Sequence, residues 1–417
     1  MTALPASQLQ PAEGARTVLP VLEQRMNSFY NNRWREQWKG RHIMRGRQPG
    51  VNSIQLMSND YLALAGHEHI RHAQIRMLED REQDVLMSGV FLGEGCSQHQ
   101  FEQRVADWSG FPSAVLCQSG YAANVGLLQA VTNQNTPVYI DMKAHASLWE
   151  GIQSAGARAC PFRHNNVGHL ERQIRVHGPG LICIDSVYST SGALAPVAKM
   201  VALARQTGCM ILVDESHSLG THGPGGSGLV AELGLQSQVD FVTASLAKAF
   251  AGRAGIILCA DDFPDYFWFT ARPAIFSSCL LGHEVAGLNA TLDLVIEDDW
   301  RRRVLGWNSE YLRQGLSAAG FNVEDSQSQI IALEAGDEYT TLRMREALER
   351  EDIFGAVFCA PATARNRSMI RLSVNAGLTI DELERIILGC TRAGEATGMH
   401  QWASARRLQR GVRAEVA

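Results

Sequence analysis

Residues 241–255, FVTASLAKAFAGRAG, place one lysine among alanines and other small residues, directly after an apolar, β-branched run. The chain has 38 lysines and arginines together, and only Lys39, Lys143, Lys199 and Lys248 are lysines. An arginine would serve equally well as a solubilising surface charge. A reaction that needs an uncharged amine, such as Schiff-base formation, excludes arginine, because guanidinium stays protonated in proteins. Lys248 is therefore a candidate nucleophilic amine.

Polar side chains follow five short apolar runs of the kind that form buried strands. Parallel strands place their carboxyl ends at one edge of a sheet, where ligands bind in open α/β folds. We therefore expect these side chains to share a pocket, although helix capping explains any one of them alone. The five groups are Gln118-Ser119-Gly120-Tyr121, then Asp141 with Lys143 and His145, Asp185 with Ser189, Asp214 with Ser216 and His217, and Ser245 with Lys248.

A pocket that combines an amine, a carboxylate, two imidazoles and small hydroxyls suits pyridoxal phosphate. Its aldehyde needs a lysine that can be neutral, and the small apolar neighbours of Lys248 are expected to lower the pKa of its amine. The pyridine nitrogen needs a fixed anion, for which Asp214 is the candidate, and His145 can stack on the ring. The phosphate prefers hydroxyls and the N–H groups at a helix N-terminus. The phosphate candidates are Ser119, Gly120, Tyr121 and Ser245.

Several of these residues also have a purely structural interpretation. Asp214 would serve equally well as a helix cap, and His217 as a hydrogen-bonded histidine of the core. The glycine-rich stretch HGPGGSG, residues 222–228, lacks the lysine and the following helix of a nucleotide-binding loop. We interpret that stretch as a turn.

Composition limits the class of protein and its partners. A hydrophobic content of 45% and a charged content of 19% predict a globular protein with a sizeable core. The net charge of −5 and pI near 6.2 argue against nucleic acid or an anionic membrane as the main partner. The chain has no apolar run long enough to span a bilayer and no N-terminal pattern typical of a secretory signal. Nine cysteines without a CxxC pair predict reduced, buried thiols, and hence a cytoplasmic protein without a metal site.

The order of the elements predicts an α/β fold. From about residue 110, continuous apolar runs alternate with helical patterns, which indicates a mostly parallel sheet covered on both faces. Residues 284–320 are interpreted as one long amphipathic helix, and residues 400–417 as a solvated basic helix. The predicted organisation is an N-terminal extension and arm over residues 1–65, a large α/β domain over 66–290 and a smaller C-terminal α+β domain over 291–417.

The stretches VDESHSLGTHG and TASLAKAFAG resemble the α-oxoamine synthases, fold-type-I pyridoxal phosphate enzymes that condense an amino acid with an acyl-CoA thioester. Further similar stretches follow the same chain order, namely SNDYLALAGH, QSGYAANVG, HASLWEGIQSAGA, DSVYSTSGALAPV, AIFSSCL and IRLSVNAGLTIDEL. The likeness runs from about residue 50 to residue 395. It implies a homodimer with shared active sites, acyl-CoA and a small amino substrate as ligands, and pyridoxal 5'-phosphate as cofactor.

The resemblance also implies roles for individual residues. Arg371 would bind the substrate carboxylate, and Ser277 or Ser278 would reach the phosphate of a neighbouring subunit. The catalytic candidates are Lys248, His217, Asp214 and His145; the cofactor contacts add Ser119, Gly120, Tyr121, Ser189, Ser245, Ser277 and Ser278; and the substrate contacts are Arg371 and Asn59.

Within that family, SNDYLAL, TASLAKAFA, PAIFSS and HNNVGHL resemble the α-hydroxyketone quorum-sensing autoinducer synthases. Such enzymes join a medium-chain acyl-CoA to 2-aminobutyrate or S-adenosylmethionine and lose carbon dioxide, which yields the amino-ketone precursor of the signal. The block SGVFLGEGCSQHQFE departs from the members that use glycine or alanine. Gly89, Glu94 and Gln98 stand there in place of an arginine, a threonine and a histidine, which agrees with a different amino donor.

Two alternatives remain open at this point. One is another α-oxoamine synthase, such as 8-amino-7-oxononanoate synthase or 2-amino-3-ketobutyrate CoA ligase, which the preferred acyl chain would distinguish. The other is a non-catalytic binding or regulatory protein on the same fold, against which the presence of the lysine, the aspartate, both histidines and the arginine argues.

Overall fold

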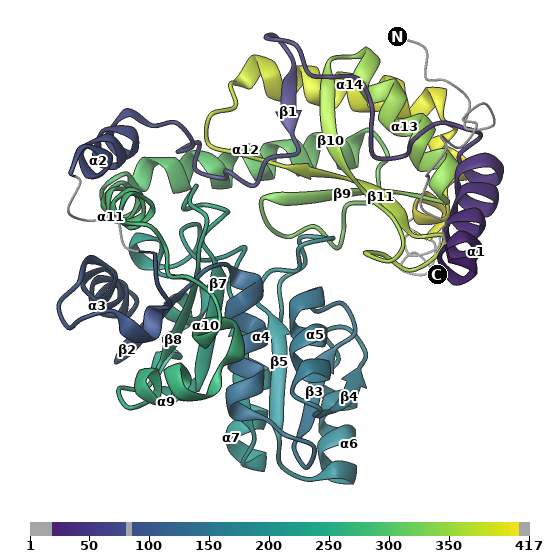
Figure 1. Ribbon diagram of the computed structural model, residues 1–417. Helices are drawn as coiled ribbons and strands as arrows, with labels where there is room; N and C mark the ends of the chain where they lie inside the picture. The colour runs from purple at the N-terminus through teal and green to yellow at the C-terminus, as the bar shows by residue number, and fades with distance from the viewer. Residues whose placement is uncertain (1–18, 81–85, 408–417) are drawn as a thin grey trace, which may run out of the picture.

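The computed structural model describes residues 19–80 and 86–407, and this part of the chain contains two β-sheets (Figure 1). The larger sheet has the strand order β2-β8-β7-β6-β5-β3-β4, and only β8 runs antiparallel to its neighbours. The predicted mostly parallel sheet is therefore confirmed. Its strands are β2 (Ser113–Cys117), β3 (Pro137–Asp141), β4 (Arg158–Phe162), β5 (Leu181–Asp185), β6 (Met210–Asp214), β7 (Phe241–Ser245) and β8 (Gly255–Cys259).

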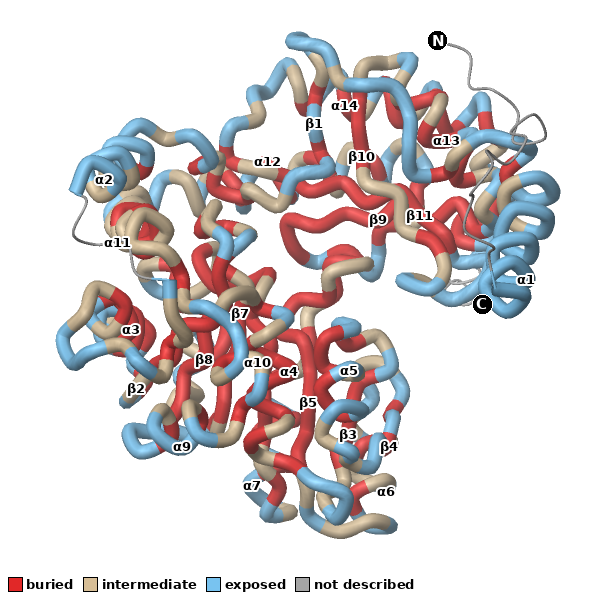
Figure 2. Tube along the Cα trace, in the orientation of Figure 1, coloured by how far each residue is buried: buried red, intermediate tan, exposed pale blue. Residues whose placement is uncertain are grey.

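Helices cover both faces of this sheet, because alternate residues of each strand point to opposite sides. Ile182 and Ile184 of β5 share one core with residues of α6 and α7, whereas Leu181 and Cys183 share another with residues of α4 and α5. Figure 2 shows the central strands as buried. The helices around this sheet are α3 (Ser97–Ser109), α4 (Gly120–Val131), α5 (Ala146–Ser154), α6 (Val167–His177), α7 (Val197–Thr207), α8 (Leu229–Glu232), α9 (Phe263–Thr270) and α10 (Arg272–Ile275).

The strand register aligns three polar residues at the carboxyl end of the large sheet. Asp185 of β5 pairs with Asp214 of β6, and Asp214 pairs with Thr243 of β7. Residues in register on neighbouring strands point to the same face of a sheet. Asp185, Asp214 and Thr243 therefore form one polar row on the face that α4 and α5 cover.

The smaller sheet has the order β1-β10-β11-β9, and an N-terminal strand lies at its edge. β1 runs parallel to β10, whereas the other pairs are antiparallel. The predicted domain boundaries at residues 65/66 and 290/291 stay predictions. Helices and strands outside the large sheet include α1 (Pro20–Ser28), β1 (Ile54–Leu56), α2 (Glu68–Glu79), β9 (Ile330–Gly336), α13 (Glu338–Arg350), β10 (Ile353–Phe358), β11 (Ser368–Ser373) and α14 (Ile380–Ala396).

The prediction of a single long helix over residues 284–320 is wrong. α11 (Gly282–Glu297) ends and α12 (Asp299–Ala318) begins around Asp298, whose ψ of 54° is not helical. Asp298 Oδ2 accepts a hydrogen bond of 2.8 Å from Arg301 Nε. Aspartate favours the position before a helix because its side chain can bond to groups of the first turn. Hydrophobic periodicity missed the break because the pattern continues on both sides of it.

The prediction of a solvated helix at the C-terminus is wrong for its described part. Trp402 is 5% exposed, and its ring lies 6.1 Å from that of Phe321 between centroids. Ser404 Oγ donates a hydrogen bond of 2.6 Å to the backbone oxygen of Glu334. The segment is buried because Trp402 and Ala405, three residues apart, pack on the core of the small sheet. Residues 408–417 of this tail, and residues 1–18 of the predicted extension, lie outside the described residues.

The structure describes all nine cysteines; none of them is in a disulfide bond, and seven are buried. Over residues 19–80 and 86–407, no helix has the length and apolar composition needed to cross a membrane. The same residues contain no group of three or more His, Cys, Asp or Glu side chains placed to hold a metal ion.

Candidate active site

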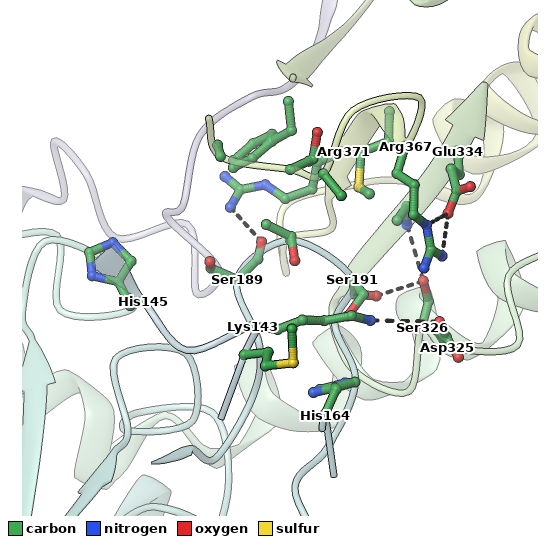
Figure 3. Close-up of a pocket in the computed structure, with 18 of the residues that line it drawn as sticks. Lys143, His145, His164, Ser189, Ser191, Asp325, Ser326, Glu334, Arg367 and Arg371 are labelled. Atoms are coloured by element: carbon green, nitrogen blue, oxygen red, sulfur yellow. Dashed lines mark hydrogen bonds and ion pairs between the residues drawn. The ribbon is translucent and has the colours of Figure 1, made fainter. Parts of the chain in front are cut away.

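A cavity of about 1130 Å³ lies between the carboxyl end of the large sheet and the small sheet (Figure 3). The loops that follow β3, β5, β6 and β7 form one side of it. β9, β10, β11 and the C-terminal segment form the other side. Six of the residues predicted from the sequence line this cavity: Asn59, His145, Ser189, His217, Lys248 and Arg371.

Lys248 follows β7 in a tight turn, in which its backbone oxygen accepts a hydrogen bond of 3.0 Å from the N–H of Ala251. Burial lowers the pKa of the Lys248 amine, and the nearby guanidinium of Arg371 lowers it further, whereas Asp214 opposes the shift. A lower pKa increases the neutral fraction of the amine, which is the form that acts as a nucleophile.

Asp214 is held in a chain of hydrogen bonds behind the lysine. Asn124 Nδ2 of α4 donates to Asp214 Oδ2 at 2.7 Å, and Thr243 Oγ1 donates to Asn124 Oδ1 at 2.6 Å. The backbone N–H of Ser216 donates to Asp214 Oδ1 at 2.9 Å. Because both oxygens accept hydrogen bonds, the carboxylate of Asp214 has a fixed orientation.

His145 lies at the N-terminus of α5, beside the same polar row. Its backbone N–H donates to Asp185 Oδ1 at 3.1 Å, and its Nδ1 lies 2.7 Å from Ser147 Oγ. Burial, together with repulsion from Asp214, raises the pKa of Asp185 well above its ordinary value. The carboxyl group of Asp185 therefore favours its neutral form more than an exposed aspartate does.

His217 is a buried histidine with a partner on the N-terminal segment. Its Nδ1 lies 2.6 Å from the hydroxyl of Tyr61, and its backbone oxygen accepts a 2.7 Å hydrogen bond from Gln329 Nε2. Burial lowers the pKa of His217 well below its ordinary value, and the charges of Lys248 and Arg371 add to this effect. The ring is therefore neutral near pH 7.

Arg371 lies on β11 and reaches into the cavity from the small sheet. Its Nη1 donates to the backbone oxygen of Ser189 at 2.9 Å, and its Nη2 donates to Asn59 Oδ1 at 2.8 Å. The guanidinium carbon lies 4.6 Å from the centroid of the Phe358 ring. Arg371 Nε is buried without a hydrogen-bond partner. Within residues 19–80 and 86–407 no carboxylate forms an ion pair with this guanidinium, so it suits an anionic ligand.

The predicted phosphate residues lie together at the N-terminus of α4, outside the lining of the main cavity. Ser119 Oγ accepts from the N–H of Ala122 at 3.1 Å and so caps the helix. A Cβ added to Gly120 would lie 2.6 Å from Cβ of Ser245, so this glycine allows the close approach of the helix to β7. Tyr121 is about half exposed beside them.

Ser277 and Ser278 lie near that helix terminus, in the loop after α10. Ser277 Oγ donates to the backbone oxygen of Pro273. The backbone oxygen of Ser278 accepts a hydrogen bond of 3.0 Å from Gln118 Nε2, one residue before Ser119. Their predicted contact with a neighbouring subunit stays a prediction.

The residues present fit pyridoxal phosphate. The amine of Lys248 and the fixed carboxylate of Asp214 meet the needs of the aldehyde and of the ring nitrogen. The close approach of α4 to β7 at Gly120 places the N-terminus of α4, with its N–H groups, beside Ser245. His145 and His217 line the same cavity as Lys248.

The block in which the sequence departs from the glycine- and alanine-using enzymes lies away from the main cavity. Glu94 is exposed, and the position of Gly89 is packed against the ring of Trp268. Gln98 is buried and donates from Nε2 to Glu102 Oε1 at 3.2 Å. Arg253, another departure, is 79% exposed at its side chain and lies 3.7 Å from Glu284 Oε1.

Sequence reasoning missed two groups of site residues. Asn124 and Tyr61 lie inside the stretches QSGYAANVG and SNDYLAL, where a polar side chain within an otherwise apolar run was the available signal. Glu334, Arg367 and Arg407 also line the cavity. Their positions carried no comparable signal, because the three residues lie far apart in the sequence.

Comparison with known proteins gives consistent matches over most of the chain. Residues 51–388 match the family described as aminotransferase class I and II. The chain is 45% identical over 372 residues to the CAI-1 autoinducer synthase of Vibrio campbellii, which covers 89% of this chain and 94% of that protein. It is 31% identical over 350 residues to a Bacillus cereus protein provisionally named 8-amino-7-oxononanoate synthase, which covers 83% of this chain and 88% of that protein.

A solved structure with the same fold is that of a serine palmitoyltransferase variant from S. paucimobilis with PLP and myriocin bound. The TM-score is 0.80, and the sequences are 28% identical over 83% of this chain and 88% of that chain. These matches extend across both sheets and are not confined to one of them. The chain therefore belongs to the α-oxoamine synthases, the pyridoxal-phosphate-dependent acyltransferases of fold type I within aminotransferase class I and II.

Proposed function

We propose that the protein joins a medium-chain acyl-CoA to a small amino substrate, 2-aminobutyrate or S-adenosylmethionine, with loss of carbon dioxide. The product is then an amino-ketone precursor of an α-hydroxyketone autoinducer. The observation that carries this proposal is the 45% identity to the CAI-1 autoinducer synthase over 89% of the chain. The sequence identity to the Bacillus cereus protein, whose provisional name is 8-amino-7-oxononanoate synthase, is lower, at 31%.

Lys248, Asp214 and His145 would hold pyridoxal phosphate. When bound, this cofactor supplies an aldehyde that condenses with amines and a protonated ring that accepts electrons. Lys248 Nζ would hold the aldehyde and, once the amino substrate has replaced it there, would be free to take the proton from the substrate's α-carbon. The carboxylate of Asp214 would keep the ring nitrogen protonated, and the imidazole of His145 would lie against the ring.

Arg371 and His217 orient the substrate in this proposal. The two Nη groups of Arg371 bind the carboxylate of the amino substrate, which decides the bond that is aligned for cleavage. We assign the hydroxyl hydrogen of Tyr61 to the hydrogen bond with His217 Nδ1, so that the neutral ring carries its own hydrogen on Nε2. That hydrogen can then bind an oxygen that gains negative charge during acyl transfer.

The active unit in this proposal is a homodimer, in which Ser277 or Ser278 contacts the phosphate in the partner's site. Each site would then be incomplete in a monomer. Activity per chain should fall when the protein is diluted below the dimer dissociation constant, as followed by sedimentation and by product formation. A fully active monomer would contradict the shared site.

The function is tested by offering the purified holoenzyme a series of acyl-CoAs with several amino donors and by identifying products with mass spectrometry. We expect an amino-ketone from decanoyl-CoA and 2-aminobutyrate or S-adenosylmethionine. Preferential turnover of pimeloyl-CoA or acetyl-CoA would instead assign one of the other α-oxoamine synthase activities.

Two lysine variants test the nucleophile. Lys248→Ala should lose the visible absorbance of the lysine-bound cofactor and all turnover together. Lys199→Ala is the matched control, because Lys199 is an exposed lysine on α7. A coloured and active Lys248→Ala protein would refute the assignment.

A further inference from the structure

The cavity extends well beyond the residues that would hold the cofactor, along β11 and toward the C-terminal segment. Arg367, Met369 and Arg371 all line it, as expected for alternate residues of an extended chain. Arg367 directly precedes β11, and the two arginines are four positions apart in the chain, which is roughly 13 Å at the usual rise per residue of extended backbone. Figure 3 shows both arginine side chains directed into the cavity, Arg371 near Ser189 and Arg367 near Glu334.

Arg367 and Arg407 share a single carboxylate. Arg367 Nη2 donates to Glu334 Oε2 at 2.6 Å, and its Nε donates to the same oxygen at 3.0 Å. Arg407 Nη2 donates to the other oxygen, Oε1, at 2.7 Å. The cluster of Arg367, Glu334 and Arg407, which we call the outer arginine pair, therefore has a net charge of +1.

The exposure of these side chains shows which charge a ligand meets. The side chain of Glu334 is 9% exposed, whereas those of Arg367 and Arg407 are 44% and 48% exposed. The carboxylate is thus covered, while guanidinium N–H groups remain open to the cavity. From this cluster an entering ligand meets donors and positive charge, which attract an oxyanion. The exposed carboxylate of Asp325, on the same cavity, lies 4.0 Å from the amine of Lys143.

Arg407 is positioned by a docked segment and not by a free tail. Asn322 Nδ2 donates to the backbone oxygen of Ser404 at 3.0 Å, and Ser404 Oγ donates to the backbone oxygen of Glu334 at 2.6 Å. Trp402 is buried at the start of the same segment. These contacts fix the backbone three residues before Arg407, so its guanidinium is pre-organised for binding.

We propose that the outer arginine pair is a second anion subsite, which binds phosphate groups of the nucleotide part of the acyl-CoA, with Glu334 as a positioning residue. This inference rests on the proposed function. Arg371 already has a ligand in that function, the carboxylate of the amino substrate. The anionic groups that remain are the phosphates of the thioester carrier, and guanidinium groups match phosphate through parallel hydrogen bonds.

Single substitutions test this subsite without leaving Glu334 unpaired. Arg367→Gln and Arg407→Gln each remove one guanidinium, while the other still pairs with the carboxylate. Arg365→Gln and Arg406→Gln are matched controls, because both arginines are exposed, lie close in sequence and do not line the cavity. A normal cofactor spectrum and thermal transition should show that each variant is folded.

Kinetics with two forms of the same thioester give the first readout. We expect Arg367→Gln and Arg407→Gln each to raise KM for the acyl-CoA roughly tenfold. The kcat should change little, and KM for the corresponding acyl-pantetheine, which lacks the phosphates, should be unchanged. The control variants should match the parent protein with both thioesters. An equal KM for the acyl-CoA in all five proteins would overturn the subsite.

Calorimetry of CoA binding to the holoenzyme gives a readout that does not depend on turnover. CoA should bind at least roughly tenfold more weakly to Arg367→Gln and Arg407→Gln than to the controls. If CoA affinity follows the arginines but no acyl-CoA is turned over, the subsite stands and the proposed function fails. If the acyl-CoA is turned over and CoA binds all variants equally, the subsite alone is wrong.

Discussion

Asn124 Nδ2 on α4 lies 2.7 Å from Asp214 Oδ2 at the end of β6, although 90 residues separate them in the chain. Asn124 uses its whole amide, since Nδ2 also donates to Ser147 Oγ at 2.9 Å and Oδ1 accepts from Thr243 Oγ1 at 2.6 Å. One side chain thus connects the carboxylate beneath the proposed ring site to α5 and to β7. In this position Asn124 is a positioning residue for Asp214.

Asn124→Ala should destabilise the protein by about 1–3 kcal/mol, because several buried polar groups lose a partner at once. Denaturant unfolding measures this change. Gln129→Ala is the control on the same helix, since both hydrogen bonds of Gln129 are exposed, one to Ser154 Oγ at 3.1 Å and one from the N–H of Arg272 at 3.3 Å. The affinity for the cofactor should also fall in Asn124→Ala but not in Gln129→Ala. Unchanged stability and unchanged cofactor affinity in that variant would show that Asp214 is positioned by other groups.

Tyr61→Phe should lower kcat roughly tenfold, because His217 loses the hydroxyl that fixes its ring. Steady-state kinetics with the best substrate pair measures the change. Tyr139→Phe is the matched control, because its buried hydroxyl donates to the backbone oxygen of Gly178 at the opposite end of the large sheet. Tyr139→Phe should cost about 1 kcal/mol of stability and leave kcat intact. Equal kcat values for both variants would exclude a role of Tyr61 through His217.

Gly120→Ala should weaken cofactor binding by at least roughly tenfold. The new Cβ would lie 2.6 Å from Cβ and 2.8 Å from Cα of Ser245, so α4 and β7 must move apart at the proposed phosphate site. Fluorescence titration of the apoenzyme with pyridoxal phosphate measures the affinity. Gly168→Ala is the control, since the nearest atom to its new Cβ lies 3.8 Å away. Tight binding by Gly120→Ala would place the phosphate elsewhere.

The stability of Glu102→Gln relative to the parent protein should increase as the pH rises. Burial raises the pKa of Glu102 to about 7 from an ordinary 4.5, against the hydrogen bonds from Leu116 and Gln98. Between these two values the folded chain binds a proton that the unfolded chain has lost, so stability falls with rising pH through about 7. The free energy of unfolding of the parent protein should fall by about 3 kcal/mol in total over this range. Glu102→Gln should not show this fall, because glutamine does not titrate.

Urea unfolding at pH 5, 6.5 and 8 tests this dependence. Glu102→Gln should resemble the parent protein at pH 5 and exceed its stability at pH 8. Asp107→Asn is the control on the same helix, because Asp107 is exposed. A constant difference between Glu102→Gln and the parent across this range would show that the buried carboxyl does not titrate there.

The sequence alone determined the parts of this protein that depend on local pattern. Continuous apolar runs predicted the strands of the large sheet, because a strand covered on both faces needs apolar residues at every position. The same pattern located Asp214 at the end of one strand and Lys248 shortly after another, at the edge where the parallel topology gathers loops. The break at Asp298 escaped this reasoning, since periodicity does not register one non-helical residue between two amphipathic helices.

Only the tertiary structure decided which polar groups meet across long chain separations. Tyr61 and His217 are 156 residues apart, and Arg371 and Asn59 are 312 residues apart. Arg407 pairs with Glu334 because the last described turn of the chain packs on β9. The arginines of that turn had suggested a solvated surface helix. Local propensity cannot specify such contacts, because they arise from the packing of whole sheets and helices against one another.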